Sequence, residues 1–115
     1  MSLPDDPAAD VTPGDTAALL AAGTVTVIDV RDDDEWAAGH IRGAIHTPLG
    51  RLGPAAVDAS KPIIAVCRSG SRSGKAAVRL RAGGLTARNM AGGMNAWART
   101  GLPVHAADGT PGSIR

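Results

Sequence analysis

Cys67 is the only cysteine in the 115-residue chain, and it stands where a reactive sulfur would be placed. It follows an apolar run, 63–66, that is typical of a buried strand, and it precedes a small-residue segment and a helical pattern over 74–82. A loop between a strand and a helix presents several backbone N–H groups to its centre, where they bind anions. A thiol held there is expected to be ionised near neutral pH, and the thiolate is the nucleophilic form.

The residues of the 67–73 loop favour such an anion-binding site. Gly70 permits the positive φ angle that a tightly curled loop needs. Small serines and charged arginines make up the rest of the loop: Arg68, Ser69, Ser71, Arg72 and Ser73. The serines let the N–H groups converge, and the arginines are expected to help lower the pKa of the Cys67 thiol. A buried, inert cysteine is the alternative, and the loop argues against it.

Charge is unevenly distributed along the chain. The net charge is only +1, yet none of the 11 acidic residues lies between positions 59 and 107. This half of the chain holds Cys67 and is locally positive, which fits either solvated helix faces or attraction of a small anionic substrate. The chain has no Phe and no Tyr to stack on bases. We therefore expect no nucleic-acid partner.

Cysteine content and apolar patterning indicate in which cellular compartment the protein acts. A single cysteine excludes an internal disulfide and an internal resolving thiol. No apolar run approaches the length of a membrane span, and residues 1–10 lack the apolar core of a signal peptide. We therefore expect a cytoplasmic protein that does not bind a membrane.

Strand and helix patterns alternate along the chain. Four segments are expected to be strands: 24–30, 45–48, 63–66 and 86–90. Five segments have helical patterns: 13–23, 32–39, 49–57, 74–82 and 93–101. This alternation predicts a three-layer α/β fold, in which helices cover both faces of a small, mostly parallel sheet. We expect one domain, 11–104, between a flexible N-terminal segment, 1–10, and a mobile tail, 105–115.

Two chemically active residues lie at the carboxyl ends of predicted strands, where parallel sheets place their functional crevice. They are Asp29 and Cys67. Asp29 is expected either to hydrogen-bond the loop or Arg31, supporting the site, or to cap nearby backbone. Arg31 is expected to be a salt-bridge partner rather than a substrate ligand. The three histidines lack metal-ligand spacing, and Trp36 and Trp97 are expected to anchor the core.

Four motifs in this order give the chain a resemblance to the single-domain rhodaneses, the thiosulfate sulfurtransferase-like family. The motifs lie at 28–31, 35–44, 67–73 and 92–103. No single motif is decisive, but all four at these separations form a specific signal. The resemblance covers about 11–104 and implies a rhodanese-like fold.

The resemblance also implies a reaction. Cys67 would attack the outer sulfur of a small anionic donor such as thiosulfate, sulfite would leave, and the resulting persulfide would pass its sulfur to an acceptor thiol or to cyanide. Arg68 and Arg72 would hold the donor, and the backbone over 68–72 would cradle the persulfide. No metal or organic cofactor is implied.

Three other functions remain as alternatives. Related phosphatases and arsenate reductases have a loop that is one residue longer, and the shorter spacing from Cys67 to Arg72 favours a sulfur atom over a phosphate. A sulfur-carrier module that takes sulfur from a protein donor needs the same loop as the enzyme. A non-catalytic regulatory domain is disfavoured because Cys67 and Arg72 are both present.

Overall fold

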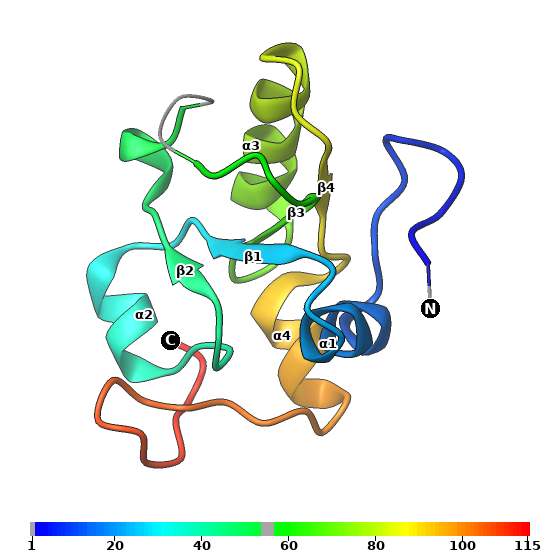
Figure 1. Cartoon of the computed structure of the whole chain (residues 1–115). Coiled ribbons are helices and arrows are strands. Elements are labelled where there is room, and N and C mark those ends of the chain that lie inside the picture. Colours follow the sequence, from blue (N-terminus) through cyan, green and yellow to red (C-terminus); the bar gives the residue numbers. More distant parts are fainter. Residues whose placement is uncertain (1, 54–56) are drawn as a thin grey trace.

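The computed structural model describes residues 2–53 and 57–115 (Figure 1). Its centre is a four-stranded parallel sheet in the order β2-β1-β3-β4. The strands are β1 (Thr26–Asp29), β2 (Ile45–His46), β3 (Ile63–Val66) and β4 (Ala87–Asn89). Each lies within a segment predicted to be a strand, so the expected parallel sheet is confirmed.

Alternate residues of the two central strands belong to two separate apolar clusters. Val27 and Ile64 belong to one apolar cluster, whereas Ile28 and Ala65 belong to the other. Successive side chains of a strand point to opposite faces, and a parallel sheet is normally covered on both. This explains why β3 is buried along its whole length.

Helices cover both faces, as the sequence predicts (Figure 1). On one face α1 (Pro13–Ala21) and α4 (Gly93–Arg99) contribute to the first cluster, and on the other α3 (Ser71–Ala82) contributes to the second. The short helix α2 (Asp33–Ala38) and a 3₁₀ turn, η1 (Leu49–Arg51), lie between β1 and β3 in the chain.

Local signals set the starts of two helices. The Thr12 hydroxyl accepts a hydrogen bond from the Asp15 amide at 3.1 Å, and Pro13 occupies the first helical position of α1. At α2, the Asp32 amide donates to the Glu35 carboxylate at 3.1 Å as part of a capping box. This box fixes Glu35 in the first turn of α2, which matters for the site below.

Two predicted helices differ from the structure. The segment expected at 49–57 is helical only in η1, and residues 54–56 lie outside the described residues. Helix α3 begins at Ser71 rather than at Gly74, because Gly70 adopts a left-handed conformation with φ 102° and turns the chain directly into the helix. Three residues of the predicted loop therefore form the first turn of α3.

Both terminal segments contact the folded domain. The Arg88 guanidinium donates to the carbonyl groups of Pro4 and Asp6. In the tail, His105 exchanges backbone hydrogen bonds of 2.9 and 3.0 Å with His40. The flexibility expected at 1–10 and 105–115 stays a prediction. Within the described residues, no helix combines the length and apolar character that crossing a bilayer requires.

Candidate active site

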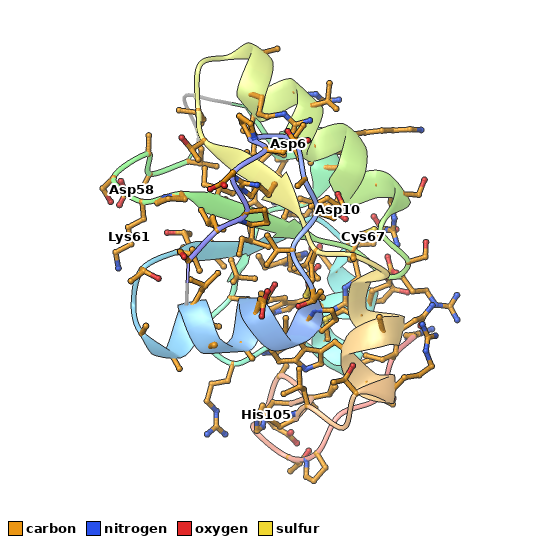
Figure 2. The ribbon with its side chains drawn as sticks, turned by 90° about the vertical axis from the view of Figure 1, so that its right-hand side faces the viewer. Asp6, Asp10, Asp58, Lys61, Cys67 and His105 are labelled. Atoms are coloured by element: carbon orange, nitrogen blue, oxygen red, sulfur yellow. The ribbon has the colours of Figure 1, made fainter. Side chains whose placement is uncertain are left out.

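Amide and hydroxyl groups that follow β3 donate hydrogen bonds to the sulfur of Cys67. Cys67 lies where the chain leaves the sheet, between α3 and α4 (Figure 2). Its Sγ accepts hydrogen bonds from the Gly70 amide at 3.0 Å and from the Ser73 hydroxyl at 3.2 Å. Only 1% of Cys67 is exposed, so these donors, rather than bulk water, surround the sulfur.

Helix α4 holds the loop in this orientation. The carbonyls of Cys67 and Arg68 accept hydrogen bonds from the amides of Met94 and Asn95, at 2.8 and 2.9 Å. Because the N–H of a trans peptide points opposite to its carbonyl, the bond from Asn95 to the Arg68 carbonyl turns the Ser69 amide toward the sulfur. Gly93 makes the approach possible, since a Cβ there would lie 2.5 Å from the Cys67 carbonyl oxygen.

These hydrogen bonds favour the ionised form of the sulfur. Burial raises the pKa of the Cys67 thiol, but the Ser73 hydroxyl and the amides of Ser73, Gly70 and Ser69 more than offset it, so the pKa lies below its ordinary value. The direction agrees with the expectation from the sequence. The expected role of the loop amides is also found, whereas the arginines are not among the leading causes and the Ser73 hydroxyl is.

Arg72 does not point freely into the site. Its guanidinium donates to both oxygens of Glu35, at 2.7 and 2.8 Å. This hydrogen-bonded pair lowers the pKa of Glu35 to about 2. The sequence assigned Arg72 to the donor anion, whereas the structure pairs it with a carboxylate from α2. Arg68 is exposed and has no ion-pair partner within residues 2–53 and 57–115.

Ser73 faces two acceptors with one hydroxyl proton. Its Oγ lies 3.2 Å from the sulfur and 2.5 Å from Oδ1 of Asn89. The amide nitrogen of Asn89 in turn lies 3.4 Å from the Asp10 carboxylate. A hydroxyl donates only one hydrogen bond at a time, so Asn89 competes with Cys67 for this proton.

Ser73→Ala is therefore expected to raise the pKa of Cys67. The substitution removes the side-chain donor and keeps the amides that also face the sulfur. The measurement is the rate of alkylation by iodoacetamide against pH, because only the thiolate reacts. Its inflection should move to higher pH. Ser71→Ala is the control, since Ser71 is exposed in the same helical turn and should leave the inflection in place. If the inflection of Ser73→Ala lies at the same pH as that of the wild-type protein, the Ser73 hydroxyl does not stabilise the thiolate of Cys67.

Asp29 and Arg31 form a buried ion pair beside the site. Their side chains are 1% and 0% exposed, and Nη2 of Arg31 donates to Asp29 at 2.7 Å and to the Gly39 carbonyl at 2.7 Å. The structure shows both roles left open for Asp29, because its carboxylate accepts from the Arg31 side chain and, at 3.0 Å, from the Arg31 backbone amide. In the described part of the chain, none of their hydrogen bonds reaches the loop of Cys67. Arg31 instead contacts the C-terminal end of α2 through the Gly39 carbonyl, and the support of the site by this pair stays a prediction.

Breaking this pair is expected to destabilise the protein strongly. Asp29→Ala leaves the buried guanidinium of Arg31 unpaired, which should lower the free energy of unfolding by about 3–5 kcal/mol. Asp33→Ala is the control, because the pair of Asp33 with Arg51 is exposed and is worth at most about 1 kcal/mol. Urea denaturation measures both. Equal losses in the two variants would show that burial of the pair has no energetic consequence.

The two tryptophans differ in role. Trp97 is buried in the core, as expected, and its Nε1 donates to the Pro103 carbonyl at 2.9 Å. Trp36 is only half-buried and belongs to neither core cluster, so the prediction that it anchors the core is wrong. Its ring instead stacks with the rings of His40 and His46, with centroid distances of 3.7 and 4.9 Å.

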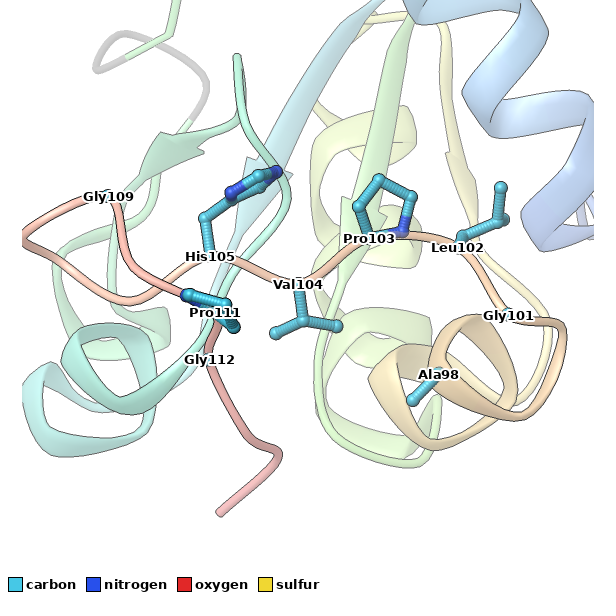
Figure 3. Close-up of a pocket in the computed structure, with 9 residues that line it drawn as sticks. All are labelled: Ala98, Gly101, Leu102, Pro103, Val104, His105, Gly109, Pro111 and Gly112. Carbon is cyan, nitrogen blue, oxygen red and sulfur yellow. The ribbon is translucent and has the colours of Figure 1, made fainter.

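An open cavity of about 550 Å³ lies away from Cys67, between the end of α4 and the tail (Figure 3). Its lining includes Leu102, Val104, His105 and Pro111, and none of its residues belongs to the 67–73 loop. His105 is the only titratable side chain that lines it. The cavity is therefore separate from the candidate site.

Two residues of the site escaped the sequence analysis. Glu35 was expected to begin a helix, and no pattern showed that it reaches Arg72 across 37 positions. Asn89 ends β4 just as Asp29 ends β1. The argument from strand ends therefore could have found Asn89, but the contact of Glu35 required coordinates.

Comparison with known proteins agrees with this geometry. A family model described as "Rhodanese-like domain" matches residues 12–100. The uncharacterised protein slr1261 of Synechocystis is 33% identical over 107 residues, which are 90% of this chain and 60% of that protein. Thiosulfate sulfurtransferase 16 of Arabidopsis thaliana, a chloroplastic protein, is 36% identical over 103 residues, covering 76% of this chain and 85% of its own.

Solved structures give the same result. The crystal structure of a rhodanese-related protein from Thermoplasma volcanium superposes with a TM-score of 0.76 at 28% identity, covering 83% of this chain and 95% of that one. The chain spans 60% of slr1261, so that relative contains sequence with no counterpart here. The matched family model takes in the whole loop of Cys67 together with the helices that hold it. The chain belongs to the rhodanese-like domain family.

Proposed function

We propose that this chain is a sulfurtransferase that carries sulfane sulfur as a persulfide on Cys67. The observation that supports this most directly is the pair of hydrogen bonds to Sγ, at 3.0 and 3.2 Å, in a loop that lowers the pKa of the thiol. Family membership and a relative named as a thiosulfate sulfurtransferase support the same activity.

The proposed reaction has two halves. The Cys67 thiolate attacks the outer sulfur of thiosulfate, the S–S bond of the donor breaks, and sulfite leaves with the bonding electron pair. The new terminal sulfur carries one negative charge, and the amides of the loop can bind it as they bind Sγ. An acceptor thiolate, or cyanide, then attacks this sulfur and restores Cys67. Such a sequence gives ping-pong kinetics.

The partners of this reaction are a small anionic sulfur donor and an acceptor thiol on a small molecule or a protein. Arg68 is exposed beside the loop and would attract the donor. Cys67 must be reduced to act as a nucleophile, so we propose a reducing compartment such as the cytoplasm.

A panel of donors tests the proposal. The protein is incubated separately with thiosulfate, with a thiosulfonate and with an alkyl persulfide. The mass of the peptide containing Cys67 is then measured by mass spectrometry. The expected result is a gain of one sulfur atom that a reducing thiol removes. If no donor adds sulfur to Cys67, the chain is not a sulfurtransferase of this kind.

A further inference from the structure

Arg72, in the first turn of α3, is paired with the carboxylate of Glu35 from α2. Glu35 is 13% exposed and Arg72 34% exposed, and both carboxylate oxygens accept from the guanidinium. The pKa of Glu35, lowered to about 2 by this contact, keeps the carboxylate ionised at neutral pH. Arg72 therefore adds little net positive charge to the site.

A count of the charges near Cys67 follows from these contacts. The thiolate carries one negative charge, Glu35 cancels Arg72, and Arg68 is the exposed cation of the loop. The remaining donors are amides and the Ser73 hydroxyl, which carry no net charge. These charges sum to zero, whereas an Arg72 without Glu35 would leave a net positive charge that attracts a donor with two negative charges more than a donor with one.

We infer that Glu35 sets the charge selectivity of the site: by neutralising Arg72, it lowers the rate with dianionic thiosulfate relative to monoanionic sulfur donors, such as thiosulfonates and ionised persulfides. This inference rests on the proposed sulfurtransferase function. Glu35 acts through Arg72 and is a specificity-determining residue rather than a catalytic one. By occupying the Arg72 guanidinium, Glu35 withholds from the dianion one of the two arginine side chains of the loop that are suited to bind two oxygens at once.

Two matched donors isolate this effect. Thiosulfate and methanethiosulfonate both offer an outer sulfur bonded to an oxidised sulfur. The oxidised sulfur carries an oxygen anion in thiosulfate and a methyl group at the same position in methanethiosulfonate. In each case the Cys67 thiolate forms the new S–S bond and the donor S–S bond breaks. The electron pair leaves on sulfite from the first donor and on methanesulfinate from the second. Their chemistry is shared, so the ratio of their rates reports mainly charge.

Glu35→Gln removes the charge and keeps the fold. The glutamine carbonyl can still accept from the Asp32 amide, which preserves the capping box of α2. Asp34→Asn is the control, because it makes the same change in charge at the next position of the same helix. The Asp34 carboxylate is 59% exposed and lies near Arg115 rather than Arg72.

The quantity measured is kcat/KM for thiosulfate divided by kcat/KM for methanethiosulfonate. Glu35→Gln should raise this ratio about tenfold at low salt, and added salt should reduce the gain. Asp34→Asn should change it less than about twofold. Adding Arg72→Gln to Glu35→Gln should abolish the gain, because the freed guanidinium is its source.

The outcomes separate this inference from the proposed function. An unchanged or lower ratio in Glu35→Gln, with wild-type protein still accepting sulfur from both donors, overturns the role of Glu35 and leaves the sulfurtransferase in place. An equal gain in Asp34→Asn also overturns it, since the effect would then come from general charge. If wild-type protein accepts sulfur from neither donor, the proposed function fails, and the inference fails with it.

Discussion

Cys67→Ser is expected to lower sulfur transfer by roughly a thousandfold or more, to the uncatalysed background. A serine hydroxyl remains protonated under conditions that ionise the thiol, and no persulfide forms on oxygen. The substitution changes one atom, and the serine hydroxyl can still accept from the Gly70 amide and the Ser73 hydroxyl. The loss therefore reflects chemistry rather than unfolding.

Steady-state sulfur transfer to cyanide measures the loss of activity, and thermal unfolding of the same preparation measures any loss of stability. Wild-type and Cys67→Ser proteins are expected to unfold at similar temperatures while their activities differ. Activity that persists in a folded Cys67→Ser protein would show that another group carries the sulfur.

Gly93→Ala is expected to give the second large loss. Its added Cβ would lie 2.5–2.6 Å from backbone atoms of Cys67 and Arg68, so the loop must move away from α4. That movement breaks the bonds that Met94 and Asn95 donate to the loop carbonyls. Since the Asn95 bond turns the Ser69 amide toward Sγ, we expect kcat/KM to fall about a hundredfold.

Gly101→Ala is the matched control for Gly93→Ala. Both glycines have positive φ angles, 60° and 84°, so both substitutions strain the backbone. A Cβ at Gly101 meets no atom within 4 Å, and that residue lies beyond the end of α4. We expect both variants to lose stability from backbone strain, but loss of activity only in Gly93→Ala. Equal activities would mean that contact with α4 does not set the orientation of the loop.

The sheet follows from short-range patterns, which explains why the sequence predicts it. β3 is an uninterrupted apolar run, and β1 alternates between two faces that both need cover. The start of α1 is equally local, because the cap at Thr12 and the proline after it lie within one turn. The position of Cys67 at the end of β3 follows from the same patterns.

The side-chain network of the site does not follow from local patterns. Arg72 was expected to bind an anion, and it does have an anionic partner, but that partner is Glu35 of α2. Which carboxylate reaches it depends on how α2 packs beside α3, and spacing in the sequence does not encode that geometry. The start of α3 was placed too late for a related reason, because a serine-rich segment is compatible with either a loop or a first helical turn.

The central claim is that converging hydrogen bonds hold the sulfur of Cys67 as a thiolate. Its most direct test is a pH titration of thiolate ultraviolet absorbance in the wild-type protein, because Cys67 is the only cysteine. The predicted result is a single transition with an apparent pKa below the ordinary thiol value of about 8.5. A transition at or above that value would contradict the claim, since burial would then outweigh the hydrogen bonds from Gly70 and Ser73.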